Sequence, residues 1–169
     1  MSDEPATALI AVYPNRAYAD AAAAHLLDVV RSDQLKVDGI AIVTKDLNGK
    51  VTAEEVGKST GKRGSKRGAV LGAVVGTIFP PSILAATVAG AAIGGVIGHV
   101  RGNSPAHRRL QSIGEQIDRG HAGVIVVVHG AESDRVASGL AGYERFDRVP
   151  LDFDVPVSDG AIATDPPPG

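Results

Sequence analysis

Glycine recurs every four residues in two series in the middle of this chain. The first series is Gly64, Gly68, Gly72 and Gly76, and the second is Gly90, Gly94, Gly98 and Gly102. Residues four apart lie on one face of a helix, so each series predicts a groove along which another helix can approach closely. Each glycine inside a helix costs about 1 kcal/mol relative to alanine, so the pattern requires compensating close packing. We expect a glycine-zipper helical hairpin over residues 64–102 that packs against neighbouring helices.

Two prolines mark the turn of this expected hairpin. No charged residue occurs between Gly68 and Gly98, and Pro80 and Pro81 divide that apolar run into arms over residues 68–79 and 82–98. Each arm is shorter than the roughly 20 residues that cross a bilayer core. The hairpin is therefore expected to dip into a membrane, to cross it and return, to form the shared core of a soluble homo-oligomer, or to pack in the core of a monomer.

Basic residues flank the hairpin on both sides. Between Val56 and Gly114 the chain has eight basic residues and no acidic one, although its formal net charge is −2. The positive-inside rule then places both ends of the hairpin on the cytoplasmic side of a membrane. Anionic lipid is the expected partner, since each basic residue near such a surface contributes about 1 kcal/mol. The residues expected to contact lipid head groups are Lys62, Arg63, Lys66, Arg67 and Arg101.

Nucleic acid is not an expected partner, because the basic run over residues 57–68 has no interleaved aromatic residues for base stacking.

The N-terminal part predicts strand, helix and strand. The apolar run at 8–13 reads as a buried strand, and helical spacing over 15–31 predicts a helix with Asn15 as its N-cap. A second strand is expected at 37–44, and Asn48-Gly49 predicts a hairpin turn into residues 50–56.

The C-terminal part predicts helix, strand, helix and strand. Ser104-Pro105 predicts a capped helix over 106–119 that Gly120 closes, and the β-branched run at 121–128 predicts a central strand. A short helix is expected over 133–143, capped by Ser133. A last strand is expected at 149–153, at a sheet edge because of Pro150.

Together these elements predict an α+β fold: a ferredoxin-like (split βαβ) sheet domain with an inserted glycine-zipper hairpin. The expected division is residues 1–56 and 104–154 for the two halves of the sheet domain and 57–103 for the basic-flanked hairpin. Residues 155–169, which are rich in proline and polar residues, are expected to be a disordered tail.

The stretch GKRGSKRGAVLGAVVGTIFPPSILAATVAGAAIGGVIG, followed by SIGEQIDRGHAGVIVVV, resembles the bacterial membrane proteins of the DUF1269 family. The resemblance covers residues 8–154. It implies an uncharacterised, membrane-associated protein with looser similarity to glycine-zipper domains of general stress proteins, and it supplies no catalytic residues.

No catalytic, cofactor or metal motif is expected. Cysteine is absent, which removes thiolate chemistry, and Gly57-Lys58-Ser59-Thr60 is not a phosphate-binding loop because Thr52 stands where a glycine is required. His121 and His129 flank one expected strand and lie roughly 26 Å apart, too far to share a metal within one subunit. His25, His99 and His107 have no acidic or thiolate companions at ligand spacing.

The sequence therefore predicts a non-enzymatic, membrane-associated, self-associating protein on the cytoplasmic face of the cell membrane, without a cofactor. The cytoplasmic assignment rests on the acidic N-terminus, which lacks a basic signal-peptide region. Two alternatives stay open. One is a soluble, cytoplasmic homo-oligomer whose hairpins form its core, and the other is a small-ligand or regulatory binding module on the sheet.

Overall fold

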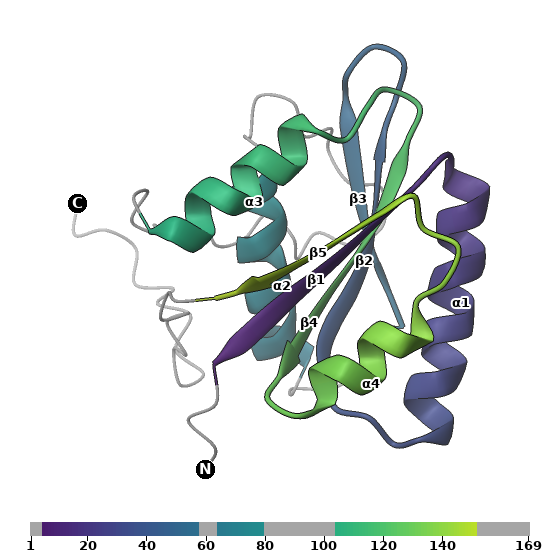
Figure 1. The fold of residues 1–169 in the computed structure, drawn as a ribbon, viewed down its shortest axis with the longest axis vertical. Helices are drawn as coiled ribbons and strands as arrows, with labels where there is room; N and C mark the ends of the chain where they lie inside the picture. The colour runs from purple at the N-terminus through teal and green to yellow at the C-terminus, as the bar shows by residue number, and fades with distance from the viewer. Residues whose placement is uncertain (1–4, 58–63, 80–103, 152–169) are drawn as a thin grey trace, which may run out of the picture.

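The computed structural model describes residues 5–57, 64–79 and 104–151, with side chains of the middle stretch described from Leu71 on. Five strands and four helices make up this part of the chain (Figure 1). They are β1 (Ala6–Tyr13), α1 (Arg16–Ser32), β2 (Val37–Lys45), β3 (Val51–Val56), α2 (Gly64–Ile78), α3 (Pro105–Glu115), β4 (Ala122–His129), α4 (Glu132–Gly139) and β5 (Arg145–Pro150). The predicted α+β class is confirmed.

The strands form one antiparallel sheet in the order β3-β2-β4-β1-β5. The central strand β4 pairs antiparallel with both β1 and β2, so those two strands run parallel to each other with β4 between them. The predicted hairpin joins β2 to the edge strand β3, and Gly49 adopts a φ of 85° in its turn. Pro150 lies on the other edge, as predicted, because proline has no N–H for a second neighbour.

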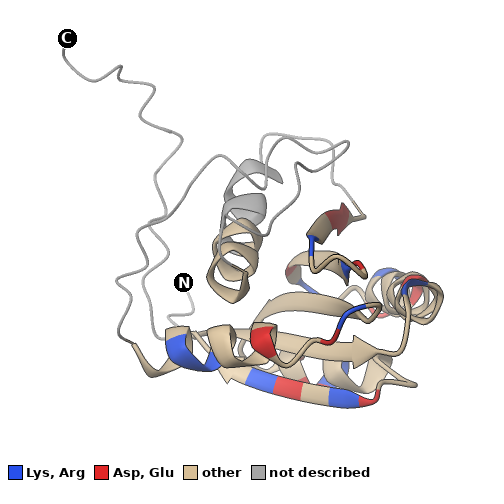
Figure 2. Ribbon diagram, turned by 90° about the horizontal axis from the view of Figure 1, so that it is seen from above, with Lys and Arg blue, Asp and Glu red and all other residues tan. Residues whose placement is uncertain are grey.

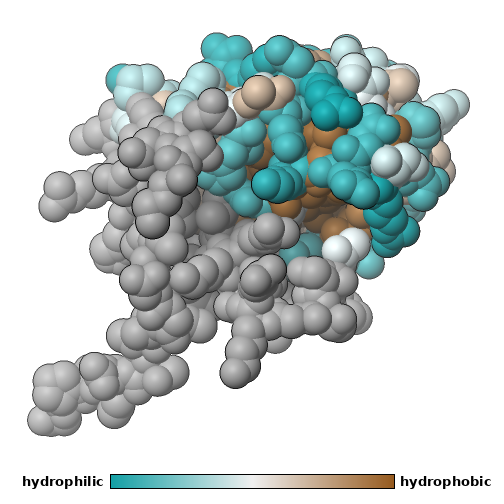
Figure 3. Space-filling model, turned by 90° about the horizontal axis from the view of Figure 1, so that it is seen from below, coloured by the Kyte–Doolittle hydropathy of each residue, from teal (hydrophilic) through white to brown (hydrophobic). Residues whose placement is uncertain are grey.

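Helices cover both faces of the sheet and separate two apolar clusters. Leu9, Ala11 and Tyr13 of β1 face α1 and α4, whereas Ala8, Ile10 and Val12 face α2 and α3. Residues 122–128 of β4 are all buried, which explains the continuous apolar run that predicted a central strand. On the surface seen from below, hydrophilic side chains surround a hollow in which apolar atoms are visible (Figure 3).

The helix N-termini agree with the sequence. The side chain of Asn15 accepts a hydrogen bond from the backbone N–H of Tyr18 at the start of α1. The Ser104 hydroxyl likewise accepts from the N–H of His107, and Pro105 follows at the first helical position of α3. Both caps are confirmed, because each oxygen satisfies one of the free N–H groups that every helix start leaves.

Two helix boundaries were predicted wrongly. α3 ends at Glu115, four residues before the expected end, and Gly120 instead turns the chain into β4 with a φ of 84° while its N–H bonds to Lys45 O. α4 is Glu132–Gly139, and its N-cap Ala131 makes no side-chain hydrogen bond. Ser133 is not the cap, because its N–H closes a turn by donating to Gly130 O and it lies inside the helix.

The last strand also lies earlier than predicted, at Arg145–Pro150, paired with β1 from Val12 to Thr7. The sequence did not predict a strand over 145–148, because three of these four residues are charged. Asp147 lies 3.6 Å from Arg109 of α3, and Arg148 bonds to Asp134 of α4 at 2.7 Å, so the strand places charges opposite helices on both faces (Figure 2). Exposed ion pairs contribute little, so β5 is held mainly by its backbone bonds to β1 and by two apolar residues, Val149 and Phe146, which pack in the clusters on opposite faces.

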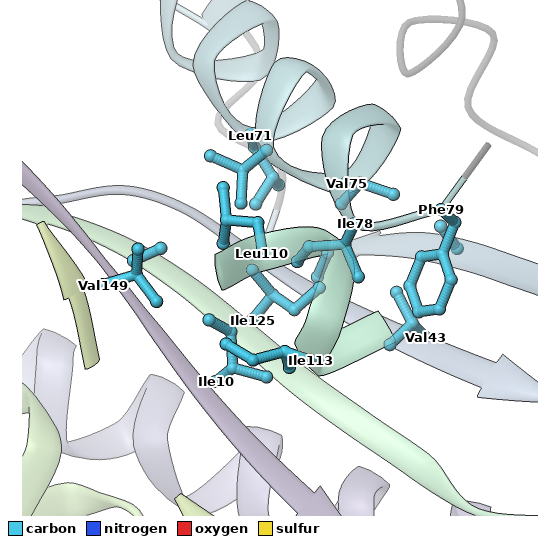
Figure 4. Close-up of a cluster of buried hydrophobic side chains, with 14 of the residues drawn as sticks. Ile10, Val43, Leu71, Val75, Ile78, Phe79, Leu110, Ile113, Ile125 and Val149 are labelled. Atoms are coloured by element: carbon cyan, nitrogen blue, oxygen red, sulfur yellow. The ribbon is translucent and has the colours of Figure 1, made fainter. Parts of the chain in front are cut away.

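The apolar side of α2 belongs to the core of this domain. Figure 4 shows Leu71, Val75, Ile78 and Phe79 pointing toward α3 and the sheet, and all four are at most 2% exposed. Their neighbours in the cluster include Leu110 and Ile113 of α3, Ile10 and Val149 on the adjacent strands, Val43 of β2 and Ile125 of β4. α2 is therefore a layer of the α+β domain. The predicted second arm, its Pro80-Pro81 turn and the 155–169 tail lie outside the described residues.

Two glycines outside the predicted zipper allow α2 to lie close to β2 and α3. A Cβ on Gly39 of β2 would lie 2.9 Å from Leu71 Cδ2, and a Cβ on Gly114 of α3 would overlap the carbonyl oxygen of Ile78. Backbone cannot move aside as a side-chain tip can, so Gly114 fixes the contact between α3 and the end of α2.

Replacing Gly114 by alanine should therefore lower the free energy of unfolding by about 1–3 kcal/mol through overpacking, despite alanine's better helix propensity. The same change at Gly76 of α2, where an added Cβ would have no atom within 4 Å in the part of the chain that the structure describes, should raise it by about 1 kcal/mol. Urea unfolding of the two variants measures both. Equal stabilisation by both substitutions would contradict the close packing of α2 on α3.

Candidate functional site

The first glycine series lies on α2, but its members have different surroundings. Gly72 is buried, whereas Gly76 is exposed, and a Cβ there would meet no atom of the described residues within 4 Å. Gly64 is the first residue of α2 and Gly68 follows one turn later. The helical conformation predicted for this series is thus confirmed. The second series, Gly90, Gly94, Gly98 and Gly102, lies outside the described residues.

The face of α2 that carries Gly76 is not the face that packs on the sheet. Residues 71, 74, 75 and 78 follow the spacing of a buried helical stripe and are all buried. Gly76 lies between Val75 and the buried Thr77, whose hydroxyl donates to Ala73 O at 2.8 Å. That bond satisfies the hydroxyl of Thr77 within the helix. Gly76 itself is exposed and has no side chain.

Of the residues predicted to contact lipid head groups, the structure describes only two, and of these only the backbone. Lys66 and Arg67 belong to the first turn of α2, but their side chains are not described. Lys62, Arg63 and Arg101 lie outside the described residues. From Leu71 to Phe79 the helix has no charged residue, as Figure 2 shows. Within the described residues, no helix has the length and apolar character that crossing a bilayer requires.

Three histidines make local contacts rather than a metal site. His121 Nε2 lies 3.3 Å from Glu144, and His129 Nε2 lies 2.5 Å from Asp38 at the β-bulge of β2. The N–H of His107 bonds to the Ser104 cap. Among the described residues, no group of three histidine, cysteine or acidic side chains could hold a metal ion. His99 lies outside them.

A groove that the sequence did not indicate lies between α1 and the loop that precedes β5. Its volume is about 280 Å³ and its walls are almost entirely apolar. It is lined by Tyr13, Tyr18, Ala21, Ala22, His25, Ala141 and Gly142. Alanines in the sequence of α1 indicated only helix packing, and the groove forms because the loop at Gly142, with a φ of 72°, approaches these small residues.

Tyr13 is the one buried aromatic residue among those that line this groove. Its side chain is 1% exposed, and its hydroxyl has no hydrogen-bond partner within the described part of the chain. Burial raises the pKa of this phenol to about 12, and the nearby Tyr143 adds to the shift. The hydroxyl therefore keeps its proton throughout the physiological range and acts as a neutral hydrogen-bond donor.

The raised pKa of Tyr13 predicts a loss of stability in alkali. The folded pKa of about 12 exceeds the ordinary value of 10.0, so the contribution is fully present below pH 10 and is lost as pH rises toward 12. Across that interval the free energy of unfolding should fall by roughly 2–3 kcal/mol more than in Tyr13→Phe. Urea unfolding at several alkaline pH values measures the difference. Absorbance that shows all three tyrosines ionising together near pH 10 would contradict the prediction.

The family assignment rests on the part of the chain that runs from α2 to β5. The profile of a family described as a protein of unknown function, DUF1269, matches residues 65–149, which is half of the chain. No curated protein and no solved structure matches the chain. The matched stretch includes α2, whose glycine spacing carried the resemblance noted from the sequence. The chain therefore belongs to the DUF1269 family of proteins of unknown function.

Proposed function

We propose that this protein is a non-enzymatic, self-associating protein that binds the cytoplasmic face of the cell membrane peripherally. The main supporting observation is the uncovered glycine surface of α2 at Gly76. From Leu71 on, that helix buries its large aliphatic side chains in its own domain, yet it retains Gly72 and Gly76, each of which costs about 1 kcal/mol in a helix relative to alanine. A second helix packed along this surface would compensate for that cost.

The partner surface would be the second glycine series, Gly90, Gly94, Gly98 and Gly102, in the same chain or in another copy. In either arrangement Pro80 and Pro81 provide the turn after α2, because proline cannot continue a helix without loss of a hydrogen bond. Packing between copies would make the protein a homo-oligomer.

The packing of α2 on α3 limits how this segment can meet a membrane. A single crossing between Phe79 and Ser104 would place α3 on the opposite side from α2, although Gly114 of α3 lies against Ile78 of α2. Two crossings would need about 40 residues at roughly 20 per pass, and the 24 residues from 80 to 103 are too few. The length of the segment therefore favours one that enters at most one leaflet. It argues against the expected hairpin that crosses the membrane and returns.

Charge supports an anionic lipid surface as the partner of this segment. Lys62, Arg63, Lys66, Arg67 and Arg101 flank the uncharged stretch with no acidic residue between them. Several such residues acting together would hold a protein at a membrane, with a contribution of about 1 kcal/mol from each.

We also infer that the strands β2, β4, β1 and β5, with α1 and α4, form a ferredoxin-like unit. Both β1-α1-β2 and β4-α4-β5 join parallel strands that have another strand between them, which is the arrangement of a split βαβ fold. In this proposal β3 adds an edge strand, and α2 and α3 cover the face that α1 and α4 leave open. This rigid base would present the glycine surface.

A soluble homo-oligomer remains the second candidate, and one observation favours it. The large aliphatic side chains of α2 from Leu71 to Ile78 are covered by its own domain, so this part of the helix does not offer them to lipid. In that candidate the glycine segments pack together in the centre of the assembly and the basic residues contact acidic surfaces of neighbouring subunits.

Substitution of Gly76 by leucine should weaken self-association by about tenfold or more, because the larger side chain separates two closely packed backbones. The space around the Gly76 Cβ position allows the monomer to fold normally. Sedimentation velocity over a concentration series measures the effect. Gly76→Ala, which keeps the surface small, is the matched control, and an unchanged oligomer in Gly76→Leu would contradict the role of this surface.

Flotation of the full-length protein with vesicles separates the two candidates. We expect it to float with phosphatidylglycerol vesicles but not with phosphatidylcholine vesicles, and to be released by high salt or alkaline carbonate, because the attachment is electrostatic and shallow. Retention after carbonate would contradict a peripheral attachment. If the protein binds neither vesicle type and sediments without lipid as a particle much larger than a monomer, the result would instead support the soluble assembly.

A further inference from the structure

Aromatic side chains are scarce in this chain, and most of them gather beside α1. The chain has three tyrosines and three phenylalanines. Tyr13 and Tyr18 line the groove between α1 and the loop before β5. Tyr143 follows Gly142 in that loop, and its ring centroid lies 5.2 Å from that of Phe146. Tyr18 is 58% exposed and Tyr143 is 42% exposed, so an exposed ring borders the groove on each side.

The groove itself is open and built from small residues. Ala21 and Ala22 of α1 line one side, Ala141 and Gly142 line the other, and no lysine, arginine, aspartate or glutamate is among the lining residues. Open grooves bordered by aromatic rings bind proline-rich segments in the polyproline II conformation. Proline rings are apolar and proline has no N–H group, so such a segment fits walls that offer little charge and few acceptors. It lies along the surface and needs no contact with a buried polar atom.

The chain itself has a segment of this composition after β5. Residues 152–169 include three consecutive prolines, Pro166, Pro167 and Pro168, which we call the proline triplet. We propose that the proline triplet docks in the groove of its own chain, between the rings of Tyr18 and Tyr143. A run of prolines favours the polyproline II conformation before it binds, so docking costs little conformational entropy.

The length of chain after β5 allows this contact. The N–H of Leu151 bonds to Ala6 O at the start of β1, whereas the groove lies at Tyr13, at the end of the same strand. The eight residues of β1 span roughly 25 Å. The 14 residues from 152 to 165 reach up to about 46 Å when extended, which is enough to pass around β5. Attachment to the same chain gives the triplet an effective concentration of about 1 mM, so even a weak contact forms.

The groove is separate from the glycine surface of α2. α1 and α2 cover opposite faces of the sheet (Figure 1), so docking of the proline triplet does not depend on self-association at Gly76. The docked triplet would cover the exposed rings of Tyr18 and Tyr143.

Because the chain has no cysteine, a nitroxide label can be attached to the full-length protein at a single position, Thr164→Cys, beside the proline triplet. Amide signals of Ala22, His25 and Gly142 in the ¹⁵N-labelled protein then report how close the label comes. We expect the label to reduce these signals by about fivefold, because the tethered triplet is docked for most of the time. Replacing all three prolines of the triplet by serine should restore the signals, whereas Pro156→Ser, outside the triplet, should not.

Two leucine substitutions on α1 form a matched pair for the groove. Ala21 lines the groove and Ala24 does not, and both are exposed, so each variant should fold normally. Ala21→Leu fills the groove and should restore the signals of His25 and Gly142. Ala24→Leu should leave them broadened.

Three results would overturn the proposal. Unbroadened signals in the labelled protein would show that the triplet does not dock, and equal broadening in Ala21→Leu or in the triple serine variant would remove the groove or the prolines from the contact. Broadening in a mixture of spin-labelled ¹⁴N protein with unlabelled ¹⁵N protein would assign the contact to a neighbouring copy instead of the same chain. Gly76→Leu should show the same broadening as the unsubstituted protein, which separates failure of this contact from failure of self-association.

Discussion

The packing of α2 and α3 on one face of the sheet is the contact on which the rest of the domain depends. The central strand β4 is apolar on both faces, and α1 and α4 cover only one of them. Without α2 and α3, the second face, with Ile10, Val43 and Ile125, would be exposed to water. Burial of a large aliphatic side chain contributes about 1.5–3 kcal/mol, so this layer is a major part of the stability. The glycine-rich helix α2 is therefore first of all a part of the hydrophobic core of this domain.

Glycine has two different uses around this helix. Gly39 and Gly114 lie on the elements that α2 contacts, and the missing side chains permit the approach of Leu71 and the Ile78 carbonyl. Gly72 and Gly76 lie on α2 itself, and Gly76 is open to the surroundings. The first pair explains how the domain closes over its sheet. Of the second pair, Gly72 is buried and only Gly76 is exposed, and the surface at Gly76 is the basis for the proposed self-association.

Packing between α2 and α3 also limits the proposed membrane attachment. Because both helices belong to one core, a single crossing of a bilayer between them is ruled out. In the proposal, the segment between them therefore enters at most one leaflet, and its basic flanks contact anionic lipid. On the opposite face of the sheet, the groove lined by Tyr13 is formed by different elements, α1 and the loop before β5.

The sequence by itself determined the elements whose signals are local. Asn15 and Ser104 predicted helix starts, Asn48-Gly49 predicted the β2–β3 turn, and the β-branched run predicted the central strand, because caps, turns and continuous burial depend on neighbouring residues. It also identified the helical glycine series and Pro150 as an edge residue.

Tertiary structure alone decided what these elements contact. Periodicity showed that one side of α2 is apolar but could not show that this side meets its own sheet rather than lipid, since both environments favour the same residues. The charged strand β5 was misplaced because its partners, Arg109 and Asp134, lie on distant helices. The roles of Gly39, Gly114 and Tyr13 likewise arise from segments that meet only after folding, so no local pattern could indicate them.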